Sequence, residues 1–536
     1  VAIATGGGKT EYTYESLGLP KDGEKFLLYV SATEVFISVE KNDTATLWSV
    51  AINADGTKEK LADKAKKIME DSFGIAVMYG NSDVIAYFDA SGYYREYDRK
   101  QGKSLKVMTE DGQLLYGTMI RDIMKQPGFV KELNEEMLQL YLSLTYVAGE
   151  NTFFRGLKKL MPGRYLIWQN GRLTIKRYWK PEFHPDESKS LEDWADEIHS
   201  TIQEIMPEVK TADEKVESFL SGGVDSSYVL AMSDAEQADG CGYEEERFDE
   251  SVLAEKTARI LGRKFSRSLI TPEQFFDIVP YVMYNMEQPL GDASAIVFTL
   301  GCNATAEHTK ICYSGEGADE FFGGYNMYRN AERYGENLKT FYVGNTNIMK
   351  EDEKKKILKK YDPDVLPIEV AREIYEETEG LDPLSKMSDV DIQIWLEGDI
   401  YLNVDKMSTA AGLEIRMPLT DRRIFDIASR MPSRYKVNEE QNKVAFRTAA
   451  AKVLPEEIAF RKKLGFIVPI RIWMADDRYN QDVRRLFNSE IAEKFFDVEA
   501  INEIFADYVG GNSDNWRKVW TIYTFLVWYE EYFIKR

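Results

Sequence analysis

The residues with the clearest capacity for chemistry lie in the segment 216–227, which reads VESFLSGGVDSS. Its apolar start predicts a short buried strand, Gly222 and Gly223 break that strand, and a helix is predicted from Val224 on. A strand, a glycine-rich loop and a helix N-terminus in this order form an anion site, because glycines let backbone N–H groups approach a phosphate. Asp225 beside such a site indicates a bound metal ion, since an uncompensated carboxylate would repel the phosphates.

A second acidic segment, SGEGADE at 314–320, follows a strand predicted at 310–313. Open α/β sheets bind substrates beyond the carboxyl ends of their strands, which is where this segment is predicted to lie. Asp319 is suited to Mg²⁺, and Glu316 is suited to proton transfer or to holding an amine. Taken alone, the segment is equally typical of a polar turn that precedes a helix.

Basic residues gather later in the chain, at Lys443-x-x-x-Arg447 and at Arg461-Lys462-Lys463. A site that cleaves ATP needs cations beside its phosphates and beside the negative charge that develops on them. The alternative for the lysine pair is a solvated helix end, which is common for lysine.

The elements that must position these segments fall into two domains, predicted at 1–185 and 186–536. The first alternates short β-like runs with turns and two helical stretches, 58–72 and 134–146, which predicts a layered, mostly β, α+β domain. In the second, strands and helices alternate, which predicts an α/β domain with a parallel sheet. After residue 325 the pattern is helical almost to the end.

Composition excludes several classes of protein. A net charge of −22 over 536 residues argues against a broad nucleic-acid or membrane surface. Three cysteines without C-x-x-C spacing and three scattered histidines give no metal signature and suit a reducing compartment. We see no signal peptide, and the apolar stretch 519–529 is too short to span a bilayer. The sequence therefore predicts a cytoplasmic protein without nucleic-acid or membrane partners.

Five motifs in series resemble the synthetase domain of class B, glutamine-hydrolysing asparagine synthetases. They are SGGVDSS, EQPLGDAS, SGEGADEFFGGY, DKMS with GLEIRMP, and RKKLGF, in that family's order and approximate spacing. The resemblance covers about residue 190 to the end and implies an adenine-nucleotide α-hydrolase-like ATP pyrophosphatase fold. It also implies that a carboxylate reacts with ATP to give an acyl-adenylate and pyrophosphate, and that a nitrogen nucleophile then displaces AMP.

The resemblance assigns a role to individual positions. Asp225 and Asp319 would coordinate Mg²⁺, Lys463 would steady the charge as the carboxylate attacks the α-phosphate, and Glu316 would help to deprotonate the amine. The residues expected to bind ATP or its pyrophosphate are Leu220, Ser221, Gly222, Gly223, Asp225, Ser226, Gly242, Ser314 and Gly315. Glutamate at 316 is the synthetase residue, whereas the β-lactam-forming branch of the family has tyrosine there.

The first half resembles the family's glutaminase domain, which has an N-terminal-nucleophile fold, but departs from its chemistry. That domain uses an N-terminal cysteine as nucleophile, whereas residue 1 here is valine and the first cysteine is Cys241. The glutamine-binding motifs Arg-Gly-Pro-Asp, His-Arg-Arg-Leu-Ser, Asn-Gly-Glu and Ser-Asp-Thr-Glu are absent from it. We therefore expect a glutaminase-like fold without glutaminase activity.

The leading prediction is an ATP-dependent, AMP-forming amide synthetase that joins a small-molecule or peptide carboxylate to ammonia or an amine. The nitrogen would come from solution or from a separate donor protein, and a homodimer is the candidate assembly. One alternative is a lactam or lasso-peptide cyclase on the same fold, against which Glu316 weighs. Another is a non-catalytic descendant that binds nucleotide or a partner protein.

Overall fold

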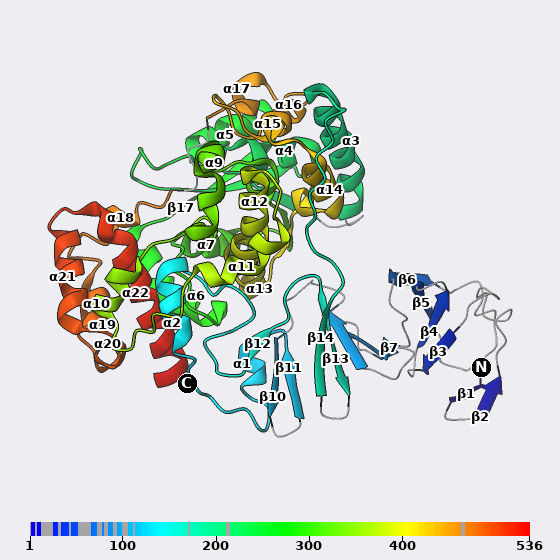
Figure 1. Cartoon of the computed structure of the whole chain (residues 1–536). Helices are drawn as coiled ribbons and strands as arrows, with labels where there is room; N and C mark the ends of the chain where they lie inside the picture. Colours follow the sequence, from blue (N-terminus) through cyan, green and yellow to red (C-terminus); the bar gives the residue numbers. More distant parts are fainter. Residues whose placement is uncertain are drawn as a thin grey trace. The chain divides into compact units, whose positions relative to one another are not determined.

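The computed structural model describes residues 113–169, 172–210, 215–462 and 467–536, together with the backbone of strands β1 to β10. Side chains are described from residue 114 on, except for 168–172. The chain divides into two compact units (Figure 1). The first comprises residues 1–131 and 156–180, and the second comprises residues 132–155 and 181–536.

The first unit consists largely of antiparallel strands. Their orders are β3-β4-β5-β6, β14-β13-β9-β8-β7, β11-β10-β12 and β1-β2. The elements are β1 (Ala2–Thr5), β2 (Gly8–Glu11), β3 (Lys25–Val30), β4 (Glu34–Lys41), β5 (Thr44–Ala51), β6 (Lys66–Asp71), β7 (Met78–Tyr79), β8 (Val84–Phe88), β9 (Tyr94–Asp98), β10 (Lys106–Glu110), β11 (Gln113–Gly117), α1 (Ile120–Ile123), β12 (Lys158–Lys159), β13 (Arg164–Gln169) and β14 (Arg172–Arg177).

The helix predicted at 58–72 is wrong over its second half. Lys66–Asp71 forms β6, which pairs antiparallel with β5 and places Met69 opposite Leu47. Lysine, alanine and glutamate favour a helix locally, but a neighbouring strand offers this backbone a ladder of hydrogen bonds. Strand formation depends on such partners more than on intrinsic preference.

A five-stranded parallel sheet in the order β17-β16-β15-β18-β19 forms the centre of the second unit and confirms the predicted α/β architecture. Its strands are β15 (Val216–Phe219), β16 (Gln237–Gly242), β17 (Lys264–Leu269), β18 (Ile311–Tyr313) and β19 (Glu414–Arg416). The edge strand β19 was not predicted. Gly412 turns the chain with a φ of 71°, and Ile415 then pairs with Cys312 of β18.

Helices make up most of the second unit, as the sequence predicted for the part after residue 325. They are α2 (Glu136–Leu144), α3 (Leu191–Val209), α4 (Val224–Met232), α5 (Ser251–Ile260), α6 (Pro272–Met286), α7 (Ser294–Ala306), α8 (Ala318–Phe322), α9 (Ala331–Tyr334), α10 (Glu351–Ile357), α11 (Ile368–Glu377), α12 (Pro383–Val390), α13 (Leu402–Ala411), α14 (Arg422–Arg430), α15 (Ser433–Lys436), α16 (Val444–Ala450), α17 (Glu456–Ala459), α18 (Ile470–Trp473), α19 (Gln481–Phe487), α20 (Glu490–Phe495), α21 (Val498–Val509) and α22 (Trp516–Tyr529). Within the described residues, no helix is both long enough and apolar enough to cross a membrane.

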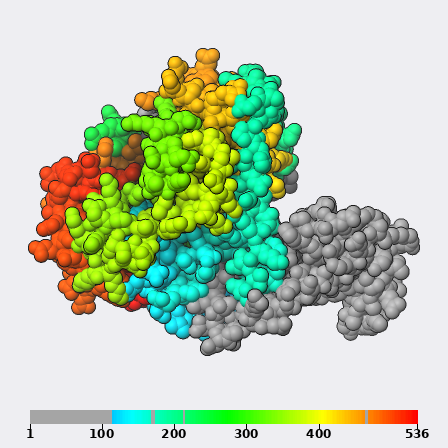
Figure 2. Space-filling model, in the orientation of Figure 1, coloured from blue at the N-terminus to red at the C-terminus, as the bar shows by residue number. Residues whose placement is uncertain are grey.

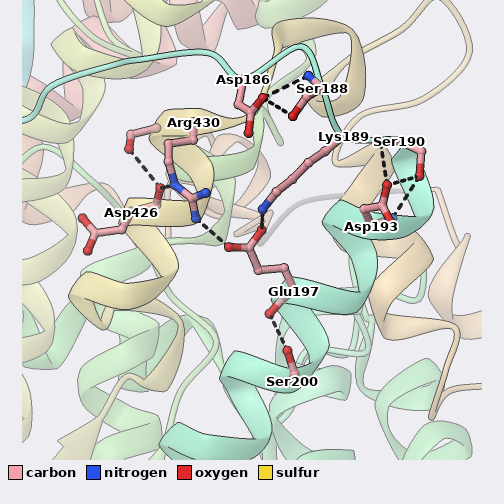
Figure 3. Close-up of polar contacts among 10 residues, drawn as sticks. Asp186, Ser188, Lys189, Ser190, Asp193, Glu197, Ser200, Asp426 and Arg430 are labelled. Carbon is pink, nitrogen blue, oxygen red and sulfur yellow. Dashed lines mark hydrogen bonds and ion pairs between the residues drawn. The ribbon is translucent and has the colours of Figure 1, made fainter.

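Polar side chains fix the start of α3 and connect it to α14 (Figure 3). The Ser190 hydroxyl accepts a hydrogen bond from the Asp193 N–H, and the Asp193 carboxylate accepts one from the Ser190 N–H, which forms a capping box. Glu197, one turn further on, accepts hydrogen bonds from Lys189 and from Arg430 of α14. Figure 2 accordingly shows the surface of α3 beside that of the yellow and orange segments that include α14 and α16.

The segment 132–155 joins the second unit through α2. The Tyr141 hydroxyl lies 2.7 Å from the Thr524 hydroxyl of α22, and the Phe153 ring packs against the Trp528 ring. Residues 519–529 of α22 are all buried. The apolar stretch near the end of the chain is therefore a core helix, as its length predicted.

A π-helix at Asp391–Tyr401 (η5) lies between α12 and α13. Runs of π-helix are rare in proteins and are frequently found at functional sites. Three residues at its end and at the start of α13, Ile400, Asn403 and Val404, line the cavity described below. The π-helix thus sets which side chains α13 directs at that cavity.

Candidate active site

The loop between β15 and α4 is a turn with its polar groups directed inward. Gly222 has a φ of 81°, a conformation that glycine adopts without strain. A Cβ atom at Gly222 would also lie 3.0 Å from the Ala254 backbone nitrogen, so α5 leaves no room for a side chain. The Ser221 N–H donates to the Ser226 hydroxyl at 3.2 Å, and the Ser227 hydroxyl donates to the Gly223 carbonyl at 2.6 Å.

The second acidic loop packs directly against this first loop. A Cβ atom at Gly315 would lie 2.7 Å from the Ser226 backbone nitrogen, so only glycine permits this approach. Strands β15 and β18 are paired in parallel, which places both loops at the same edge of the sheet. The second segment thus lies at the carboxyl end of a parallel strand, as the sequence predicted.

Asp225 and Asp319 converge on the ammonium group of Lys443. The Lys443 Nζ atom lies 2.7 Å from Asp225 Oδ1 and 2.8 Å from Asp319 Oδ1. The lysine side chain is 2% exposed, and the two carboxylate side chains are 20% and 19% exposed. Gly324 makes room for this cluster, since a Cβ atom there would lie 1.7 Å from Asp319 Oδ1.

Two arginines connect the late basic segment to the phosphate loop. Arg447 donates hydrogen bonds to the carbonyls of Ala459 and Arg461, at 2.7 and 2.9 Å. Arg461 in turn donates to the Gly222 carbonyl at 2.6 Å. Burial lowers the pKa of both guanidinium groups, with nearby carboxylates acting in the opposite direction. The sequence analysis singled out Arg447 and Arg461 as basic residues, but it did not predict that they would connect the late basic segment to the phosphate loop.

One cavity of about 290 Å³ brings these elements together. Glu316, Asp319, Lys443, Arg461 and Lys462 contribute to its lining. The residues predicted to bind ATP that also line it are Leu220, Ser221, Gly222, Gly223, Asp225, Ser226, Ser314 and Gly315. The geometry thus collects around one space most of the residues that the sequence selected.

Two predicted residues stand apart from that set. Gly242 does not line the cavity within the described residues, although Cys241 and Tyr243 on either side do. A Cβ atom at Gly242 would lie 2.6 Å from the Ser251 hydroxyl, so this glycine permits packing against the start of α5. Lys463 lies outside the described residues, and its role stays a prediction.

Sequence reasoning missed two features of the site. Lys443 was noted only as one of several late cations, because its contacts depend on a left-handed turn (φ 58°) that no local pattern indicates. Glu320 is buried behind Asp319 and accepts a hydrogen bond of 2.5 Å from the Tyr325 hydroxyl. Burial, and next the charge of Asp319, raise the pKa of Glu320 to about 7. The position of Glu320 directly after Asp319 in SGEGADE is the sequence feature that could have indicated this residue.

Comparison with known proteins agrees with this geometry. Residues 197–530 match the asparagine synthase family, and residues 96–179 match the glutamine amidotransferase domain. The chain is 31% identical over 469 residues to the glutamine-hydrolysing asparagine synthetase 1 of Bacillus subtilis, covering 80% of this chain and 73% of that protein.

More distant relatives carry related names. A putative glutamine-hydrolysing asparagine synthetase of Mycobacterium bovis is 28% identical over 450 residues, covering 76% of this chain and 69% of that protein. The amidase chyE of Penicillium rubens is 28% identical over 261 residues, or 43% of this chain and 38% of that protein. The family match spans more than half of the chain and coincides with the unit that contains the cavity. The chain therefore belongs to the asparagine synthase family, and its similarity to asparagine synthetases indicates a ligase that forms amide bonds.

Proposed function

We propose that this protein is an ATP-dependent amide synthetase that forms AMP and pyrophosphate by adenylating a carboxylate. The observation that carries the proposal is the convergence of Asp225, Asp319 and Lys443 beside the phosphate loop and Glu316 in one cavity. Paired acids and a buried cation next to a helix N-terminus suit a polyphosphate with a divalent ion. Family membership supports ATP-dependent amide synthesis in general, and the AMP-forming route is our proposal.

The residues present fit Mg²⁺. Asp225 Oδ1 and Asp319 Oδ1 face the same point, where the Lys443 ammonium lies, and these two carboxylates would hold the ion. When bound, the ion would neutralise charge on the leaving pyrophosphate. Lys443 would remain beside the phosphates as a second compensating charge.

The proposed reaction has two steps, and different groups of the site act in each. In the first step the substrate carboxylate attacks the α-phosphorus and the bond to the β-phosphate breaks. The N-terminus of α4, which follows the loop 221–223, would hold the leaving pyrophosphate. In the second step the nitrogen attacks the acyl carbon and AMP leaves with the electrons of the C–O bond. Glu316 lines the cavity and would accept the proton that the nitrogen loses.

We further propose that the first unit does not hydrolyse glutamine. The proposal rests on the missing glutamine-binding motifs in residues 1–185, although residues 96–179 match the glutamine amidotransferase domain.

Pyrophosphate release across a panel of carboxylic acids and amines, with ammonium chloride compared with glutamine, tests the proposal. We expect release with ammonium or an amine and none that depends on glutamine. Asp225→Asn should abolish release while leaving the far-ultraviolet circular dichroism unchanged, because the amide cannot hold the metal. Asp234→Asn, which removes an equal charge from a surface ion pair with Lys210, is the matched control and should retain activity. Glutamine hydrolysis by the purified protein would contradict the assignment of the first unit.

A further inference from the structure

A separate cavity of about 340 Å³ lies in the helical part of the second unit. It is bordered by the 3-10 helix η4 (Gly335–Thr340), by α11 and by Lys386 of α12, and we call it the α11 cavity. Helices α11 and α12 lie side by side (Figure 1), and η4 packs against both. No described residue lines both this cavity and the active-site cavity. The volume lies in the range of small-molecule sites, so the α11 cavity is large enough for a ligand of its own.

Apolar groups form the least exposed part of the α11 cavity. Leu338 of η4 is buried, and Ile368 and Tyr375 of α11 are half-buried. The Tyr375 hydroxyl donates a hydrogen bond of 2.8 Å to the Tyr342 carbonyl, which fixes the ring and occupies its hydroxyl proton. These three side chains therefore offer a ligand mainly apolar surface.

The side of the cavity formed by η4 and α12 has an excess of positive charge. Lys386 and Lys339 both pair with the Glu336 carboxylate, at 3.1 and 3.6 Å. The Lys386 side chain is only 10% exposed, whereas that of Glu336 is 76% exposed. An ammonium largely removed from water needs a firm counter-charge, and an exposed glutamate that serves two lysines is a weak one. A carboxylate brought by a ligand would supply the missing charge.

The side formed by α11 has an excess of negative charge. Arg372 and Glu369 form an ion pair there, so their charges cancel. Glu376 and, just beyond the helix, Glu379 add two exposed carboxylates to the same side. A simple anion would be repelled by these carboxylates, and a simple cation would be repelled by the lysines of the other side. The lining therefore favours a ligand that carries one charge of each sign.

We propose that the α11 cavity binds an α-amino acid with an apolar side chain, in its zwitterionic form. The ligand carboxylate accepts hydrogen bonds from the Lys386 ammonium, in place of Glu336 or beside it. The ligand ammonium faces Glu376 and Glu379, and the ligand side chain packs on the apolar surface between the two charged sides. Binding at this site does not depend on the reaction proposed for the active-site cavity.

Isothermal titration of the full chain with L-leucine at pH 7 tests the site. We expect leucine to bind, and we expect two analogues that each lack one charge to bind about 10-fold more weakly or worse. N-acetyl-L-leucine lacks the ammonium, and L-leucinamide lacks the carboxylate. Equal affinity for all three compounds, or no binding of leucine at millimolar concentration, would overturn the proposal.

A variant of the positive side locates the ligand carboxylate. Lys386→Met keeps the length of the side chain and removes its charge, so it should weaken leucine binding about 10-fold or more and leave leucinamide binding unchanged. Thermal unfolding verifies that the variant is folded. Lys360→Met, which removes a lysine from a surface ion pair with Glu135, is the matched control and should bind leucine like the parent. Unchanged leucine affinity in Lys386→Met, with displacement of leucine by ATP, would place the ligand in the active-site cavity and contradict the proposal.

A variant of the negative side locates the ligand ammonium and involves exposed residues only. Glu376→Gln combined with Glu379→Gln should weaken leucine binding but leave the affinity for N-acetyl-L-leucine unchanged, because that analogue has no ammonium to lose a partner. Glu377→Gln removes an equal charge from α11 at a position that does not line the cavity, and it should bind leucine like the parent. A double variant that binds leucine as tightly as the parent would contradict the proposed orientation and the zwitterion site with it.

Discussion

Carboxylates are neutralised in two different ways within the second unit. At the cavity, Asp225 and Asp319 form ion pairs with the Lys443 ammonium. Behind it, Asp391 is fully buried and accepts hydrogen bonds from the hydroxyls of Tyr328 and Tyr342. Burial raises the pKa of Asp391 to about 8 despite these bonds. The difference teaches that a cation keeps a carboxylate ready for ionic ligands, whereas tyrosines hold it as a neutral structural group.

Removal of the cation should have the largest effect. We expect Lys443→Met to lower the rate of pyrophosphate release about 100-fold or more, because two acids would then repel the phosphates without compensation. Steady-state kinetics at saturating Mg²⁺ measures this. Lys452→Met, at a surface ion pair with Asp196, is the control and should retain near-full activity. A fully active Lys443→Met protein would show that the two acids need no lysine.

We expect the buried carboxyl group of Asp391 to make the stability of the protein depend on pH. Its pKa is raised in the folded state, so the folded protein binds the proton more tightly and stability falls as pH rises from the unfolded value through about 8. Asp391→Asn removes this dependence, and its stability relative to the parent should improve by about 4 kcal/mol between pH 5 and pH 9. Denaturant unfolding at both pH values checks this. An equal effect at both would mean that Asp391 is ionised in the fold.

Glu197, a partly exposed carboxylate that is paired with two cations, is expected to show the opposite pH dependence to Asp391. Burial acts to raise its pKa, but hydrogen bonds from Lys189 and Arg430 lower it below the usual value (Figure 3). The stability it contributes is therefore present above the unfolded pKa and is lost as pH falls. Since the group is partly exposed, Glu197→Gln should cost only about 0.5 kcal/mol at pH 7 and less at pH 3. A larger cost at pH 3 than at pH 7 would reverse the assigned sign.

The sequence allowed prediction of those parts that depend on local pattern. Strand, glycine loop and helix at 216–232, and the strand before 314, follow from apolar runs, glycines and spacing. The parallel sheet followed from their alternation. The strand at Lys66–Asp71 could not be predicted, because its pairing partner decides its state.

Contacts between residues that are far apart in the chain could not be predicted from the sequence either. Lys443 reaches Asp225 across 218 positions of the chain, and Asp391 accepts hydrogen bonds from Tyr328 and Tyr342, which lie 63 and 49 positions before it. Neither relation leaves a periodic or motif signal. Charged residues noted one by one in a sequence become a site only when the fold fixes their separations.

The π-helix at Asp391–Tyr401 gives the chain an unusual route to new specificity. Each residue of an α-helix turns the chain by about 100°, so loss of a single residue here would restore α-helical winding and rotate the start of α13 by about that angle. Asn403 and Val404 would leave the cavity wall, and other side chains of α13 would replace them. A one-codon deletion could therefore exchange part of the substrate pocket while the phosphate loop and its acids stay unaltered.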